Sequence, residues 1–271
     1  MALGGNPVFA NDKNFREPRN GAATLPAQMS SEELQHLYDA PSAGPAQTGR
    51  MTYDDVIMKT VATLALVLVG AALGWMVPIL TLPGMVVGLV LGLVNSFKKE
   101  PSKALILGYA LFEGLFLGGL SMFMERVYPG IVVQAVLGTL SVFAVTLLLF
   151  KSGKVRATPK MTRFFMIALG GYALFSLVNL GLMVFGVNSS PWGLRSEPIP
   201  GTNIPFGLVL GLLAIGLAAF SLIVDFTSVQ RGVQAGLPAK YSWTAAFGLT
   251  VTLVWLYVEI LRLLAILRGN D

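Results

Sequence analysis

Seven long apolar stretches fill most of the chain after residue 55 and limit the folds that it can adopt. They cover residues 56–77, 83–97, 103–124, 130–151, 161–187, 205–230 and 243–267. A helix needs about 20 apolar residues to cross the hydrocarbon core of a bilayer, and a chain in lipid must satisfy its backbone hydrogen bonds within helices or a closed barrel. The stretches therefore predict an all-α integral membrane protein with seven transmembrane helices.

The composition agrees with a membrane protein and excludes several functional classes. Hydrophobic residues make up 54% of the chain and charged residues 12%, whereas a soluble domain is about 25% charged. The chain has no cysteine, so disulfides, thiolate nucleophiles and cysteine metal sites are excluded. Its net charge of +5 is not gathered into a basic patch interleaved with aromatic residues, so we expect no nucleic-acid partner.

The second stretch is the shortest and begins at Pro83. We expect it to be tilted, or lengthened by the turn before it; a six-span arrangement with this segment re-entrant is the alternative. Glycines four residues apart let membrane helices approach closely, and their recurrence favours one compact bundle over residues 53–271. These pairs are Gly70/Gly74, Gly88/Gly92, Gly114/Gly118 and Gly207/Gly211.

Residues 1–52 are polar and rich in proline, glycine, alanine, asparagine and glutamine. Their apolar surface is too small to offset the entropy of ordering, so we expect a mostly disordered tail with one short helix, capped by Ser30 and Glu33. Docking of a protein partner is the alternative role. Charged residues interrupt the tail, so we expect no cleavable signal peptide. Thr52 or Asp54 is expected to cap the first transmembrane helix.

The lysines and arginines predict the orientation. Most of the 19 lie in segments on the same side of the membrane as the N-terminus. The segments on the other side contain Arg126, Arg195, Arg262 and Arg268. The positive-inside rule then places the N-terminus in the cytoplasm and, with seven spans, the C-terminus outside. The cytoplasmic face would meet anionic lipid headgroups through Lys98, Lys99, Lys151, Lys154, Arg156 and Lys160.

Three of the 14 acids lie inside the predicted spans: Glu113, Asp225 and Glu259. Placing an ionisable side chain at the centre of a membrane helix costs about 2.5–3.5 kcal/mol, so such a residue is by default a candidate functional residue. Each also has a purely structural interpretation. Glu113 could be protonated and bonded to a helix carbonyl, Asp225 could pair with Arg231 or a loop donor, and Glu259 could pair with Arg262 on its own helix.

The functional interpretation is a proton-sensitive cluster of acids. Two carboxyl groups close together in a poorly solvated bundle cannot both ionise cheaply, so protonation would change the charge and gate a path. Ionised, Asp225 and Glu259 are hard oxygen ligands suited to calcium. In upright helices, however, the two would differ in depth by roughly 16 Å. Direct pairing needs helix tilt or a sixth span that continues towards Gly236; otherwise the acids are separate stations along one pathway.

Enzymatic functions find little support. The one histidine, His36, lies in the tail. The chain has no zinc-protease motif, no serine–histidine pair within a span and no glycine-rich phosphate loop. An intramembrane aspartyl protease needs two aspartates in its spans, and this chain has one. We therefore expect no enzyme and no cofactor, with calcium only as a permeating ion.

Three motifs resemble the Bax inhibitor (transmembrane Bax inhibitor motif) family, most closely its bacterial branch. They are Phe112-Glu-Gly-Leu-Phe-Leu-Gly118, Asp225 late in the sixth stretch, and Leu256-Tyr-Val-Glu-Ile-Leu261 in the seventh. The resemblance covers residues 52–268. It implies seven helices with the last one central, and a pH-sensitive calcium leak of the bacterial plasma membrane whose proton-sensing pair is Asp225 and Glu259.

The chain departs from the family pattern at two points. The family commonly has aspartate at the position of Glu259, and the connection between the sixth and seventh stretches is longer than expected. We predict a pH-sensitive calcium or cation leak in which Glu113 and Arg262 line or stabilise the path. A proton-coupled transporter of a small solute and a non-transporting regulatory protein that binds a partner are the alternatives.

Overall fold

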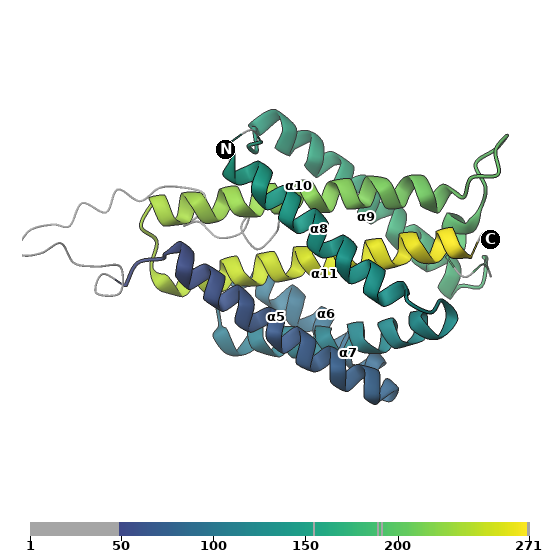
Figure 1. Ribbon diagram of the computed structural model, residues 1–271, viewed down its shortest axis with the longest axis horizontal. Coiled ribbons are helices and arrows are strands. Elements are labelled where there is room, and N and C mark those ends of the chain that lie inside the picture. Colours follow the sequence, from purple (N-terminus) through teal and green to yellow (C-terminus); the bar gives the residue numbers. More distant parts are fainter. Residues whose placement is uncertain (1–48, 154, 189, 191, 270–271) are drawn as a thin grey trace, which may run out of the picture.

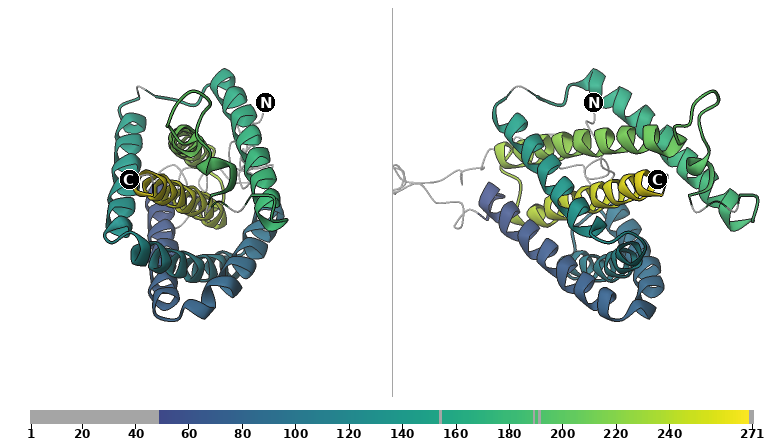
Figure 2. Two further views of the ribbon diagram at one scale, coloured as in Figure 1. Left: turned by 90° about the vertical axis from the view of Figure 1, so that its right-hand side faces the viewer. Right: turned by 45° about the vertical axis from the view of Figure 1, so that its right-hand side comes forward.

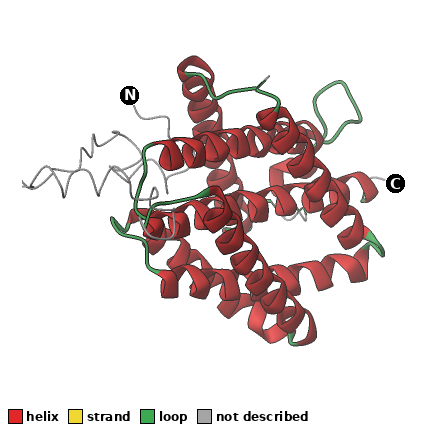
Figure 3. Ribbon diagram, turned by 60° about the vertical axis from the view of Figure 1, so that its left-hand side comes forward, coloured by secondary structure: helices red, strands yellow, loops and turns green. Residues whose placement is uncertain are grey.

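The computed structural model describes residues 49–153, 155–188, 190 and 192–269. Within these residues, every long element is an α-helix, and seven of the helices are long and apolar enough to cross a membrane. The predicted fold class and the seven apolar stretches are confirmed, and the protein is a multi-pass membrane protein (Figures 1 and 3). The helices are α5 (Tyr53–Met76), α6 (Thr81–Phe97), α7 (Lys103–Val127), α8 (Ile131–Lys151), α9 (Pro159–Val184), α10 (Phe206–Gln234) and α11 (Ser242–Arg268).

The second span reaches full length by the expected route. A 3₁₀ turn, Pro78–Leu80, leads directly into α6, and together they give an apolar span over Pro78–Phe97. The Thr81 hydroxyl bonds the Pro78 carbonyl at 2.7 Å, which joins the turn to the helix. This continuous length supports seven spans over the six-span alternative.

Helix α11 is the centre of the bundle. Seen along the bundle, the other helices surround it (Figure 2), and buried side chains lie on all its faces, from Ala245 and Ala246 to Leu256 and Ala265. A helix that is apolar all round lies in a protein core or in a membrane, and the buried faces of α11 place it in the core of this bundle. Helix α9 lies at the opposite extreme, because most of its surface faces outward and would meet lipid.

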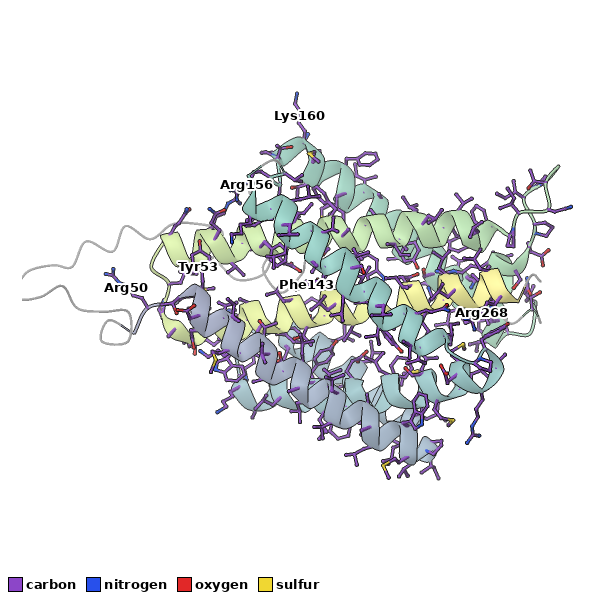
Figure 4. All side chains as sticks on the ribbon, viewed as in Figure 1. Arg50, Tyr53, Phe143, Arg156, Lys160 and Arg268 are labelled. Atoms are coloured by element: carbon purple, nitrogen blue, oxygen red, sulfur yellow. The ribbon has the colours of Figure 1, made fainter. Side chains whose placement is uncertain are left out.

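The ends of the bundle differ in charge. We call the end with Arg50, Arg156 and the α10–α11 connection the N-terminal end, and the end with Arg268 and the α9–α10 connection the C-terminal end (Figure 4). At the N-terminal end, Lys240 donates to Glu100 at 2.9 Å. This hydrogen bond and the lysine charge lower the pKa of Glu100. The pair is exposed, so it contributes little to stability.

The first described residues are packed against the bundle. The Met51 amide donates to the Leu237 carbonyl at 2.6 Å, and the Ala239 amide donates to Gly49 at 2.7 Å. The Met51 side chain is buried in the main apolar cluster. Thr52 caps α5, because its hydroxyl oxygen accepts a hydrogen bond from the Asp55 amide at 3.1 Å. Thr52 is one of the two residues predicted as the cap. The helix predicted after Ser30 lies outside the described residues.

Helices α5 and α7 are in backbone contact through the predicted glycine pairs. A side-chain carbon at Gly74 would collide with the Leu115 carbonyl, and one at Gly118 would collide with the Ala71 carbonyl. Both obstacles are backbone atoms, which cannot rotate away. The close approach therefore depends on the absence of side chains at these positions.

Valine at Gly74 or Gly118 is expected to destabilise the fold. Overpacking a close contact costs about 1–3 kcal/mol, so the thermal midpoint in detergent should fall and less monodisperse protein should be recovered. The matched control is Gly181→Val on α9, where an added Cβ meets nothing within 4 Å. Equal midpoints for Gly118→Val and Gly181→Val would contradict the packing argument.

Candidate functional site

Asp225 lies at the buried interface of the two central helices. Its side chain is fully buried, at 0% exposure, within a run of α10 that is buried on every face. Thr252 of α11 donates its hydroxyl to Asp225 Oδ2 at 2.6 Å. A carboxylate and a hydroxyl oxygen are thus brought together from two helices, and both are hard oxygen donors of the kind that calcium prefers.

Glu259 lies further along α11 in a different polar environment. It is 2% exposed, and Arg262 Nη1 donates to Oε1 at 2.9 Å and to Oε2 at 3.0 Å. Trp255 Nε1 donates to Oε1 at 3.1 Å. Residues three or four apart share one face of a helix, so the sequence itself places Trp255, Glu259 and Arg262 together. The ion pair with Arg262 is present as the structural interpretation expected.

Tyr172 connects this acid to the peripheral helix α9. Its hydroxyl donates to Glu259 Oε1 at 2.5 Å and accepts from Arg262 Nη1 at 3.1 Å. The ring also packs against Trp255, with centroids 6.2 Å apart. A phenol that reaches an ionised carboxylate in a buried site forms a charge-assisted hydrogen bond, which is stronger than a neutral one.

Arg195 completes the group from the α9–α10 connection. It lies in the 3₁₀ turn Gly193–Ser196, is 5% exposed, and donates through Nη2 to the Tyr172 hydroxyl at 3.1 Å and to Ser176 Oγ at 2.8 Å. The sequence analysis counted this arginine only as a charge in an outer loop. No helical spacing links it to Glu259, because its contact depends on how the loop folds back. We call Glu259, Arg262, Trp255, Tyr172 and Arg195 the Glu259 cluster.

The two central acids lie at different levels of the α10–α11 pair. Thr252, the partner of Asp225, precedes Glu259 by seven residues, which is about 10 Å of helix rise. Helix α10 extends to Gln234, beyond Val229, as direct pairing would require. Even so, the two carboxylates meet different partners at different depths, as the rise of upright helices indicated.

Glu113 belongs to another part of the bundle. It lies on α7 opposite Gly88 of α6, where a side-chain carbon would come within 2.8 Å of Glu113 Oε2. One turn earlier, Tyr109 packs edge-on against Phe247 of α11 with centroids 5.0 Å apart. The acid is therefore accommodated by a glycine at the α6–α7 contact and does not join Asp225 or Glu259.

Hydroxyl groups add further polarity around α11. Thr63 of α5 and Thr250 of α11 are both buried, and their hydroxyls lie 2.8 Å apart. Ser121 of α7 and Tyr257 of α11 form a similar pair at 2.6 Å. Among the described residues, no three histidine, cysteine, aspartate or glutamate side chains gather closely enough to hold a metal ion. A cation bound at this site would be coordinated by a single carboxylate together with neutral oxygen atoms.

Comparison with known proteins agrees with the sequence motifs. No curated protein sequence matches the chain. The family model described as Bax inhibitor 1 like matches residues 6–269. The match extends through all seven helices and begins well before residue 52, where the resemblance seen in the sequence began. The chain therefore belongs to the Bax inhibitor 1 like family.

Proposed function

We propose that the protein is a pH-sensitive leak for calcium or another cation, with its path beside α11. One observation carries this proposal: Asp225 and Glu259 are 0% and 2% exposed at two levels of the central helices. Buried carboxyl groups within membrane spans are expensive and commonly mark ion or proton pathways. Family membership and the resemblance of the motifs support the same function.

The different surroundings of the acids suit two different tasks. Asp225 accepts a hydroxyl hydrogen bond from Thr252 at 2.6 Å, and we assign it as the cation ligand. Glu259 is neutralised by Arg262 at 2.9 Å, so a cation would have to compete with a guanidinium there. We assign Glu259 as the proton-sensitive gate, and Glu113 as a stabilising acid at the α6–α7 contact.

The direction of the pH dependence follows from the Glu259 cluster. Protonation removes the negative charge that faces Arg262 and, through Tyr172, Arg195. Removing one partner of a buried ion pair costs about 3–5 kcal/mol, and less where, as for Arg262, the other partner is partly exposed. The packed arrangement is thereby weakened. We expect cation flux to rise on acidification, as Glu259 becomes protonated.

The basic N-terminal end supports an orientation for this path. Arg50 and Arg156 lie towards this end, whereas Arg268 lies at the other (Figure 4). The positive-inside rule then favours a cytoplasmic N-terminus and a C-terminus outside, in the bacterial plasma membrane that the resemblance implies. The Glu259 cluster would face the outer side.

Calcium flux into liposomes that hold the purified full-length protein tests the proposal. The external pH is scanned from about 5 to 8, so that the flux is compared in acid and at neutral pH. Flux that exceeds that of protein-free liposomes and rises on acidification is the expected result. Equal flux with and without protein at every pH would contradict the leak. Saturable, proton-linked counterflow of a small solute in its place would identify a transporter.

A further inference from the structure

The connection between α9 and α10 is folded back onto the bundle. Asn179, near the end of α9, donates through Nδ2 to the Trp192 carbonyl at 3.2 Å and accepts the Leu194 amide at 2.7 Å. Gly193 between them has φ +59° and lies directly against the Asn179 side chain, so a residue with Cβ would be excluded. Asn179 thus fixes the backbone of the turn that carries Arg195.

Arg195 inserts beneath this turn as a buried charge. Its guanidinium lies 5.3 Å from the ring centroid of Tyr172 and 5.7 Å from that of Phe175. In the described part of the chain, the ion pairs do not include Arg195. An arginine that is 5% exposed must be stabilised by nearby acceptors or negative charge. The charge that reaches it is that of Glu259, through Tyr172.

The Tyr172 hydroxyl is the link between the turn and the acid. A phenol has one proton to donate and two lone pairs to accept with. The proton goes to Glu259, and the lone pairs accept from Arg195 and Arg262. Because the carboxylate polarises the phenol, it strengthens the hydrogen bond that the phenol accepts from Arg195.

We propose that Arg195 is a positioning residue that latches the α9–α10 connection over the C-terminal end of α11, and that the charge of Glu259 holds the latch closed. The inference rests on the proposed function, because it names the element that Glu259 controls. Gly207 marks where the turn covers the core: a side-chain carbon there would lie 2.7 Å from both the Arg195 carbonyl and Ile266 Cδ1. Release of the turn would expose Ile266, which is 6% exposed in the latched state.

Few charges compete for Glu259 in this arrangement. The ionisable groups that face it are Tyr172 from α9, Arg195 from the turn and Arg262 from α11. Helices α8 and α10 pack nearby, but their ionisable side chains lie towards the N-terminal end: Lys151, Asp225 and Arg231. Protonation of Glu259 would leave two guanidinium groups sharing one phenol oxygen with no carboxylate, and their repulsion would favour release of the turn.

The labelling of a single cysteine shows whether the latch is open or closed, and it requires no flux measurement. The chain contains no cysteine, so Ile266→Cys in the full-length protein in liposomes gives one thiol beneath the turn. Its labelling rate by a membrane-impermeant maleimide is measured across the same pH range. Each rate is divided by that of Val127→Cys, an exposed position at the end of α7, which corrects for the pH dependence of the reagent.

Arg195→Gln in the Ile266→Cys background is expected to raise the labelling ratio about tenfold or more at neutral pH, as for the loss of a charge-assisted hydrogen bond. Its pH dependence should also disappear. Tyr172→Phe, which keeps the ring, should act in the same direction if Arg195→Gln folds poorly. Arg195→Lys should retain part of the protection and of the pH dependence. Arg268→Gln, at a partly exposed arginine that bonds the Pro129 carbonyl, is the control and should change neither.

The latch would be overturned if Arg195→Gln and Tyr172→Phe both label as slowly as the parent at every pH. It would also be overturned if lysine and glutamine at position 195 behave alike, or if Arg268→Gln behaves as Arg195→Gln does. A different result would contradict the proposed function while leaving the latch intact. If protection of Ile266→Cys follows pH and Arg195 as expected while no variant passes cations, the latch stands and the leak does not.

Discussion

Asp225→Asn is expected to reduce calcium flux about tenfold or more at every pH, because each 1.4 kcal/mol of lost cation binding is a factor of ten. Asparagine keeps the shape of the side chain and its oxygen can still accept from Thr252, which donates at 2.6 Å. The change therefore removes the charge with little change in packing. A unit charge 4 Å away at an effective dielectric constant of about 20 is worth about 4 kcal/mol, so the charge dominates the expected loss.

The control for this substitution is Asp54→Asn. Asp54 is exposed in the first turn of α5, so its change from acid to amide leaves the central helices intact. Flux through this variant should equal that of the parent, with the same pH profile. If Asp225→Asn passes calcium as fast as Asp54→Asn, Asp225 is not the ligand of the permeating ion.

Glu259→Gln is expected to pass cations at neutral pH as fast as the parent does in acid, and its flux should no longer follow pH. Glutamine mimics the protonated acid, since it leaves Arg262 and Arg195 without the carboxylate that they share. The measurement is the flux scan used for the parent protein. Glu197→Gln, at an exposed acid of the α9–α10 connection, is the control and should keep the parent's profile.

A double variant distinguishes a change in gating from a general loss of stability. Breaking a buried ion pair leaves one charge uncompensated, whereas removing both partners is often nearly neutral. The thermal midpoint of Glu259→Gln should therefore be lower than that of Glu259→Gln combined with Arg262→Gln. Flux through Glu259→Gln that still rises on acidification as in the parent would contradict the gate assignment. No recovery of the midpoint in the double variant would contradict the proposed role of the ion pair.

The sequence determined the membrane fold because hydropathy acts locally. The length and polarity of each stretch decide whether it can cross a bilayer, so the seven spans, the three acids inside them and the cap at Thr52 could all be predicted. The pair of Glu259 and Arg262 was predictable for the same reason, since a helix brings residues three apart together. Helix rise also indicated that Asp225 and Glu259 differ in depth.

Only the tertiary structure decided which distant residues share the site with these acids. Thr252 as the partner of Asp225, and Tyr172 with Arg195 beside Glu259, come from different elements whose contact depends on helix rotation, crossing angle and loop path. No periodicity in the chain records these quantities. Met51 shows the same limit, because a residue in a polar segment is buried through pairing with Leu237, far along the chain. Local patterns fix where each helix lies in the membrane, whereas the packing of one helix against another determines the surroundings of its charges.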